Sequence, residues 1–309
     1  MSALPIRRPA VAGSFYPSQA DRLRKLTAAL LEAASQLPDQ GLDMLPAGLL
    51  VPHAGLVYSG VTAAAAWRTL AGGGAGEAAD APDDVDAGPL TVVILGTNHM
   101  NAGLNGIAVW DAGGWDMPTG AVEVNRALAA EIVALGGPFA VDLASHLGEH
   151  SIEVQLPLLT AVAPSALIVP LAVSAGTGDE AMDAGEALGL LLADRRDEGE
   201  RIVLVVSSDM AHYPAAAACE RATNQLLPLI LATDGFSLAA QERALVSAKI
   251  DGLACGMCGI EPAVLGMAAF RAMDATHATT LAASTSADAG GDPDRTVGYL
   301  AVRFDTPVS

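Results

Sequence analysis

Histidines follow three apolar runs of the chain, at points where imidazole and carboxylate groups could bind a metal ion and move protons. His53, His99 and His212 each come within a few residues of a run typical of a buried strand. The carboxyl ends of parallel strands lie at one edge of an open α/β sheet, and ligands bind at that edge. Neutral imidazole is the commonest metal ligand in proteins. Since the chain has only 6 histidines, this placement indicates a site for a metal ion and for acid–base chemistry.

The histidines at the first two strand ends also have simpler interpretations. His53 lies in the sequence Pro52-His53-Ala54-Gly55, where an imidazole could equally cap a turn. His99 follows Asn98, and such polar steps are ordinary turn chemistry. Two histidines at equivalent strand ends nevertheless favour metal binding, with Asn98 lining the same site.

Asp209 and His212 could form a carboxylate–imidazole pair, in which the carboxylate orients the ring and raises its basicity. We therefore expect both to be catalytic residues. Ser207 and Ser208 also allow a serine-hydrolase interpretation, but the chain has no Gly-x-Ser-x-Gly motif. An Asx-type entry into a helix is a further alternative, and we favour the catalytic pair over it.

The segment His146-Leu147-Gly148-Glu149-His150 matches the H-x-x-E-H pattern of inverted zinc proteases. That chemistry needs both histidines on one helical turn. The glycine weakens a helix at this point, and Ser151 is typical of the cap of a helix that begins there. We favour a loop leading into a helix, with Glu149, His150 and Glu153 facing the site.

The 3 cysteines are too few for a disulfide scaffold in a chain of this length. Cys255 and Cys258 form a single C-x-x-C pair, which leaves a structural zinc site, a redox pair and small buried side chains as interpretations. Cys258 lies shortly before Pro262, a residue suited to the start of a helix. A cysteine beside a helix N-terminus has a stabilised thiolate, which would make it a better metal ligand.

The composition argues against several classes of function. With a net charge of −19, the chain could not neutralise a row of phosphates, so we expect neither nucleic acid nor an anionic membrane surface as a partner. Hydrophobic residues make up 51% of the chain, enough for a large core, yet no apolar run is long enough to cross a membrane. The N-terminus lacks the apolar core of a secretory signal, so a cytoplasmic protein is expected.

Alternating strands and helices predict one α/β domain over residues 1–309, with a mainly parallel central sheet and helices on both faces. Strands are expected at 47–51, 90–95, 106–109, 166–171, 202–206, 279–284 and 296–304, the last two antiparallel. Helices are expected at 18–35, 61–70, 125–135, 151–162, 179–193, 216–231, 237–246 and 262–273. The first would begin with a capping box at 18–21, and residues 71–88 would form a surface loop.

Taken in order, these motifs resemble the Memo family, whose prokaryotic members are called protein B of the AmmeMemoRadiSam system. The resemblance rests on Pro52-His53-Ala54-Gly55, Asn98-His99, Glu149-His150-Ser151-Ile152-Glu153, Ser207-Ser208-Asp209-x-x-His212, Cys258-Gly259-x-x-Pro262 and the segment 8–17. It spans residues 8–304 and implies a fold similar to class III extradiol dioxygenases, which are non-haem Fe(II) enzymes. It also implies metal ligands at His53, His99 and Cys258, with Asp209 and His212 in the same cleft.

The resemblance implies a single metal ion, iron(II) before copper or zinc, in a dioxygenase-like oxidoreductase. The family's thiolate stands where the dioxygenases have a carboxylate, and this softer donor shifts preference toward copper(I). The alternative is a non-catalytic module that carries metal or binds a peptide in the same cleft, as animal members are implicated in iron and copper handling and in phosphotyrosine-peptide binding. By family, the protein partners would be a radical-SAM protein and an AMMECR-type protein, and the cleft would take a small molecule or a peptide.

Cys255 adds a thiol one turn from the expected ligand Cys258. We hypothesise that oxidation joins the two in a disulfide and removes the ligand, so that metal binding depends on redox state. Cys255→Ser should then retain metal under oxidant, whereas equal metal loss from both proteins would contradict the hypothesis.

Overall fold

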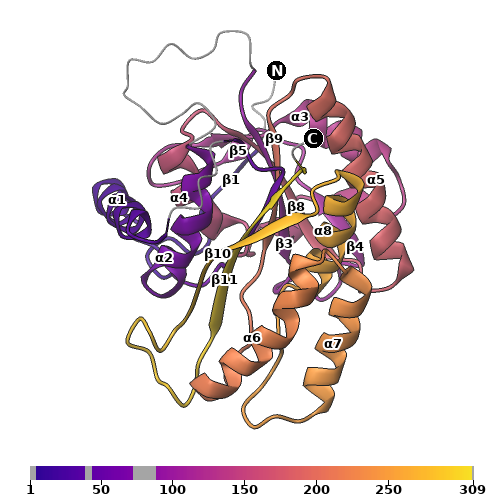
Figure 1. The fold of residues 1–309 in the computed structure, drawn as a ribbon. Helices are drawn as coiled ribbons and strands as arrows, with labels where there is room; N and C mark the ends of the chain where they lie inside the picture. The colour runs from indigo at the N-terminus through magenta and orange to yellow at the C-terminus, as the bar shows by residue number, and fades with distance from the viewer. Residues whose placement is uncertain (1–4, 39–43, 72–87, 308–309) are drawn as a thin grey trace.

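An eight-stranded β-sheet with strand order β10-β11-β2-β9-β3-β8-β4-β7 forms the centre of the molecule (Figure 1). A computed structural model describes residues 5–38, 44–71 and 88–307. The strands of this sheet are β2 (Gly48–Val51), β3 (Thr91–Thr97), β4 (Gly106–Val109), β7 (Phe139–Val141), β8 (Leu167–Ser174), β9 (Ile202–Ser207), β10 (His277–Thr285) and β11 (Gly298–Asp305).

The middle of the sheet is parallel. β2 pairs with β9, β9 with β3 and β3 with β8, all in parallel, and β4 pairs with β7 in the same way. β11 is antiparallel to both β10 and β2, and β4 is antiparallel to β8. The predicted α/β fold, with a mainly parallel centre and an antiparallel final pair, is therefore confirmed. As a consequence, β2, β3 and β9 end at one edge of the sheet.

Helices cover both faces of the sheet (Figure 1). Residues of α1, α2 and α4 pack into one hydrophobic cluster, and residues of α3 and α5 to α8 pack into the other. The helices are α1 (Ala20–Ser35), α2 (Leu56–Trp67), α3 (Arg126–Ala134), α4 (Leu156–Val162), α5 (Asp179–Asp197), α6 (Ala216–Leu231), α7 (Gly235–Ser247) and α8 (Ile260–Ala272).

Alternation along the buried strands divides the core between the two faces. In β9, Val203 and Val205 belong to the cluster under α1, α2 and α4, whereas Leu204 and Val206 belong to the cluster under α5 and α8. All four side chains are 0% exposed, and burial of each aliphatic side chain contributes roughly 1.5–3 kcal/mol. A strand that is apolar on both sides must be covered on both sides, which is why this run predicts a central strand.

Helix starts are the least well predicted boundaries. The N-cap of α1 is Gln19, and no side chain caps this helix, so the expected capping box at 18–21 is wrong. α2 begins at Leu56, five residues before the expected start at 61, because the chain turns into the helix directly after Gly55. The expected helix at 151–162 begins as the 3₁₀ turn η3 (Glu153–Gln155) and becomes α-helical only afterwards.

Several short elements escape sequence analysis. A three-stranded sheet joins β1 (Ile6–Arg7), β5 (Gly114–Trp115) and β6 (Val122–Glu123). Strands of two residues show no periodicity, and β7 is only three residues long. The 3₁₀ turns η1 (Arg68–Leu70) and η2 (Ala144–His146) complete the description. Most of the expected loop at 71–88 lies outside the described residues.

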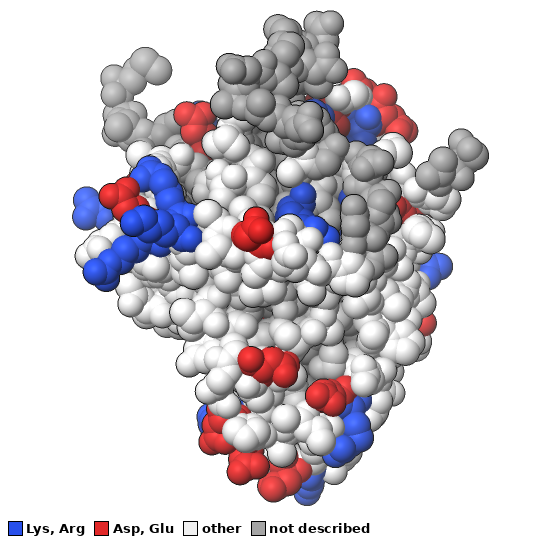
Figure 2. Space-filling view, turned by 60° about the vertical axis from the view of Figure 1, so that its left-hand side comes forward, with Lys and Arg blue, Asp and Glu red and all other residues white. Residues whose placement is uncertain are grey.

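Charged side chains are unevenly placed on the surface shown in Figure 2. Lys and Arg gather in a small group at the upper left, acidic residues interspersed with some basic ones lie toward the bottom, and the middle of this face is mostly uncharged. Among the described residues, no helix combines the length and apolarity that crossing a membrane requires.

Candidate metal centre

A cavity of about 810 Å³ opens where β2, β3 and β9 end, and it collects most of the predicted site residues. The predicted site residues among its lining are His53, His99, His150, Asp209, His212, Cys255 and Cys258. They come from the strand ends and from the segments before α4 and α8, so residues up to 205 positions apart in sequence meet here.

His53 is buried, and its hydrogen bonds determine which ring nitrogen is open. Its Nδ1 lies 3.0 Å from the Ser207 hydroxyl, which itself donates to the Ser151 carbonyl at 2.6 Å. Because that hydroxyl has one hydrogen and has donated it, it must accept from His53 Nδ1–H. The lone pair of Nε2 then faces the Cys258 sulfur at 3.3 Å. Burial lowers the pKa of His53 to about 4, which keeps the ring neutral and able to bind a metal ion.

Asp209 holds the backbone that leads into α2. Asp209 Oδ1 accepts hydrogen bonds from the backbone N–H of His53 at 2.7 Å and of Ala54 at 3.1 Å. Although burial raises the pKa of Asp209, the nearby His53 and His212 lower it overall, so the group is a carboxylate. This carboxylate therefore fixes the position of His53 relative to the end of β9.

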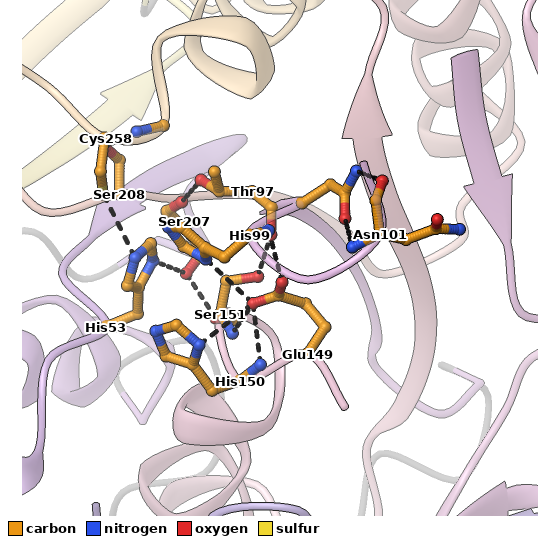
Figure 3. Close-up of polar contacts among 12 residues, drawn as sticks. His53, Thr97, His99, Asn101, Glu149, His150, Ser151, Ser207, Ser208 and Cys258 are labelled. Atoms are coloured by element: carbon orange, nitrogen blue, oxygen red, sulfur yellow. Dashed lines mark hydrogen bonds and ion pairs between the residues drawn. The ribbon is translucent and has the colours of Figure 1, made fainter. Parts of the chain in front are cut away.

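Glu149 orients two further imidazoles from behind (Figure 3). Its Oε1 lies 3.0 Å from His99 Nδ1 and 3.2 Å from His150 Nδ1. The backbone N–H groups of His99, His150 and Ser151 also donate to this carboxylate, at 2.6, 2.8 and 2.9 Å. Although burial raises its pKa, the contacts with His99 and these N–H groups hold the pKa of Glu149 well below its usual range. A carboxylate at Nδ1 leaves Nε2 of each ring as the open nitrogen, as in metal sites with histidine ligands.

Among the described residues, two groups of potential metal-binding atoms share His53. The donors of His53, His99 and His150 all lie within 4.8 Å of one another, and so do those of His53, Asp209 and Cys258. The expected ligands His99 and Cys258 therefore fall in different groups, and His150 enters as a ligand candidate rather than as a lining residue. The three rings are close together, with centroids 4.7 to 5.4 Å apart.

His212 faces Asp209 without a hydrogen bond. The distance from its Nε2 to Asp209 Oδ2 is 3.9 Å, and this buried nitrogen has no hydrogen-bond partner among the described residues. The backbone of His212 is fixed, since its N–H donates to the Cys255 carbonyl at 3.0 Å. A buried, open nitrogen on the cavity wall is suited to proton transfer with a bound ligand.

Cys255 and Cys258 are both free thiols that line the cavity. Burial and the nearby Asp209 raise the pKa of Cys258 well above its usual value, so the expectation of a thiolate stabilised by α8 does not hold. Gly259 allows the segment that carries Cys258 to lie directly against Ser208, because a Cβ at position 259 would lie 2.6 Å from Ser208 Cβ. The redox pairing of the two cysteines stays a prediction.

Three residues singled out by the sequence analysis, Glu153, Asn98 and His146, do not line the cavity. Glu153, expected to face the site, is not part of the cavity wall and instead binds Arg7 and Tyr16, each at 2.6 Å. Asn98, also expected to line the site, bonds locally to Asn101. His146 is fully buried, and its Nε2 contacts the Ala108 carbonyl at 3.0 Å. The segment therefore does not form the zinc-binding geometry of an inverted zinc protease, because His146 and His150 share neither a helix nor a group of metal-binding atoms.

Sequence analysis also missed Glu242, a buried carboxyl group on α7 that lines the cavity. Its Oε1 accepts from the Gly256 N–H at 2.9 Å, which holds the segment between the two cysteines, while Oε2 has no partner among the described residues. Burial raises the pKa of Glu242. An isolated glutamate on an ordinary helix carries no local signal of this role.

A family model and related proteins match nearly the whole length of the chain. A family model described as "Memo-like protein" matches residues 7–303. A MEMO1 family protein of Methanopyrus kandleri is 34% identical over 306 residues, covering 96% of this chain and 98% of its own. Another from Aquifex aeolicus is 34% identical, covering 97% and 99%. Among solved structures, an uncharacterized protein from Escherichia coli K12 matches with a TM-score of 0.42 and 18% identity over 70% of this chain and 86% of its own.

Proposed function

The chain belongs to the Memo family, and on that premise we propose that it binds one metal ion in its cavity and acts as a dioxygenase-like oxidoreductase. The observation that carries this proposal is the orientation of three imidazoles: Nδ1 of His53 contacts the Ser207 hydroxyl, and Nδ1 of His99 and of His150 contact the Glu149 carboxylate. In each ring Nε2 is therefore the nitrogen offered to a metal ion, which at His53 would replace the contact with the Cys258 sulfur. We propose His53, His99 and Cys258 as ligands, with His150 as the competing donor.

The donor set narrows the choice of metal. Neutral imidazoles with one sulfur suit iron, copper or zinc, whereas magnesium and calcium prefer oxygen ligands. We propose iron(II) as the metal of the oxidoreductase. When bound, it would supply a Lewis acid and a redox centre.

The chain's own groups would bind the substrate and move its proton. In this proposal His212 Nε2 takes a proton from a phenolic or other acidic group of the substrate, since this nitrogen is open and lines the cavity. Asp209, 3.9 Å away, stabilises the imidazolium that results. Aromatic and apolar side chains of the cavity wall exclude water from the reacting groups.

Metal binding is tested with protein purified and loaded with Fe(II) without oxygen. His53→Ala should lower Fe(II) affinity by at least about 100-fold, more than the loss of an outer hydrogen-bond partner costs, because His53 belongs to both donor groups. The matched control is His277→Ala, an exposed histidine on β10. Cys258→Ser and His150→Ala then decide between the two groups, since only the true ligand lowers the affinity. Metal bound equally by wild type and His53→Ala would refute the metal proposal.

Catalysis is tested by oxygen uptake with Fe(II) and a panel of phenols. His212→Ala should lower the rate at least about 100-fold while its iron content stays equal to that of wild type. Unchanged uptake would rule out His212 as the proton carrier. Absence of uptake in wild type with every phenol would favour a non-catalytic role.

A second candidate is a module that carries metal or binds a peptide in the same cleft, and the sulfur of Cys258 favours it. Thiol donors select copper(I) over harder ions, and this sulfur lies 3.3 Å from His53 Nε2. A carrier should hold copper(I) and release it to a competing chelator without consuming oxygen. Failure to bind copper(I) would exclude the carrier.

A further inference from the structure

The cavity wall includes an arginine, Arg295. Arg295 is the only Lys or Arg among the described residues of the cavity wall. Its guanidinium forms no hydrogen bond or ion pair with any described residue; its side chain stacks instead on Tyr213, with Cζ 4.1 Å from the ring centre. The chain has a net charge of −19. A guanidinium that has no carboxylate partner among the described residues leaves its five donors available to a ligand.

Backbone contacts hold Arg295 beside the proposed proton carrier. The Tyr213 N–H donates to the Thr296 carbonyl at 2.7 Å, and the Thr296 N–H donates to the Pro214 carbonyl at 2.9 Å. His212 itself forms an isolated bridge with Val297. The segment that carries Arg295 is therefore joined directly to the segment that carries His212.

Tyr213 keeps an unfavourable backbone conformation to hold this arrangement. Its φ is +73°, in the left-handed region that a bulky residue rarely adopts and that is common at functional sites. Tyr213 remains 40% exposed. Its ring stacks on the guanidinium, which limits the rotation of Arg295 and reduces the entropy lost when an anion binds.

The rest of the cavity wall indicates what kind of anion fits. Among the described residues of the wall, three carboxyl groups, those of Asp209, Glu242 and Asp292, line the same cavity as the Arg295 guanidinium. They would repel a dianion such as a phosphate ester more strongly than a monoanion. The wall also contains aromatic and apolar side chains, namely Phe15, Tyr58, Tyr213, Met257, Val297 and Tyr299. These surfaces suit a planar apolar body.

We propose that the ligand of this cavity is a small aromatic carboxylate, whose carboxylate binds the guanidinium of Arg295 and whose ring packs against the aromatic wall. The other end of the ring then points toward the histidines, and this part of the proposal rests on the proposed function. Arg295 is a specificity-determining residue, since it distinguishes an acid from a neutral ligand of the same shape.

The test compares 4-hydroxybenzoate with the neutral 4-hydroxybenzamide by calorimetry at pH 7.5, on protein with and without Fe(II). Wild type should bind the acid about tenfold more tightly than the amide, the size expected for a charge-assisted hydrogen bond at a partly exposed site. Arg295→Met should lose this preference, Arg295→Lys should keep part of it, and Arg22→Met, which alters an exposed arginine on α1, should keep all of it.

Equal affinity for acid and amide in wild type, or an unchanged preference in Arg295→Met, would overturn the proposal. The iron content should be the same in all four proteins, because Arg295 is not among the metal-binding groups. If instead no protein retains iron, the metal proposal fails, and the preference measured without iron still tests Arg295.

Discussion

Two buried carboxylates four residues apart, Glu149 and Glu153, do different work. Glu153 accepts from Arg7, Tyr16 and the backbone N–H groups of residues 10 and 11, all of which belong to the framework near the N-terminus. Glu149 bonds to the imidazole of His99 and lies 3.2 Å from Nδ1 of His150, and both rings line the cavity. A buried carboxylate thus stabilises the fold when its partners have no further group to offer a ligand. It orients a binding site when its partners, such as imidazoles, have a second nitrogen that can bind a ligand.

The histidines on either side of Glu149 show the same contrast. His146 packs against both Trp110 and Trp115, with ring centroids 5.8 and 5.7 Å away, and its Nε2 contacts a backbone carbonyl. His150 stacks on His99 and lines the cavity. The closed network around Arg7 and Glu153 should therefore govern stability, and the open histidine wall should govern ligand binding.

The largest effect is expected from a substitution in the closed network around Arg7 and Glu153. Glu153→Ala removes the partner of Arg7, whose side chain is 1% exposed, and should lower the free energy of unfolding by about 3–5 kcal/mol. Urea unfolding measures this loss. Glu153→Gln, which keeps the volume, should lose less, and Glu131→Gln at a half-exposed pair serves as control. A loss in Glu153→Ala no larger than in that control would contradict the assignment.

Low pH should lower the free energy of unfolding through protonation of His146. Burial lowers the pKa of His146 from 6.5 to about 4, so the unfolded chain binds one more proton between these two pH values. The free energy of unfolding should therefore fall by roughly 2–3 kcal/mol as the pH drops from 6.5 to 4, and the contribution should be fully present above pH 6.5. His146→Gln should reduce this fall in urea unfolding followed against pH. An identical pH profile in the variant would exclude His146 as the source.

A third substitution acts on the open wall. Glu149→Gln replaces the carboxylate that orients His99 and His150, and should lower metal affinity by about 10–100-fold. Metal titration without oxygen measures the change. Glu153→Gln, which leaves both imidazoles untouched, should keep its metal affinity. Equal losses of metal affinity in the two variants would show that the two carboxylates do not differ in their role at the metal site.

The smallest effect is expected at Glu242, which combines one bonded and one open oxygen. Glu242→Gln keeps an acceptor for the Gly256 N–H and should change the free energy of unfolding by less than about 1 kcal/mol, whereas Glu242→Ala should cost about 1–3 kcal/mol by leaving that N–H unpaired. Thermal unfolding measures both. Similar losses in the two variants would show that the carboxylate charge, rather than the hydrogen bond, matters.

The amino-acid sequence determined the parts of this protein that depend on local pattern. Runs such as 202–206 are apolar on both faces, so they had to be central strands, and the polar residues after them had to meet at one edge of the sheet. That reasoning placed His53, His99 and His212 at one edge of the sheet, and all three line the same cavity. It failed at Glu153, because a residue next to the site in sequence can point away from it.

Tertiary structure alone decided which atoms are open. The Nδ1 of His53 is engaged by Ser207, 154 residues away, and that of His99 by Glu149, 50 residues away. The same is true of Arg295, which has no carboxylate partner among the described residues because of where their acidic side chains lie after folding. Hydrogen bonding and charge are satisfied between side chains that meet only after the chain has folded, so no local pattern can state which of them remain for a ligand.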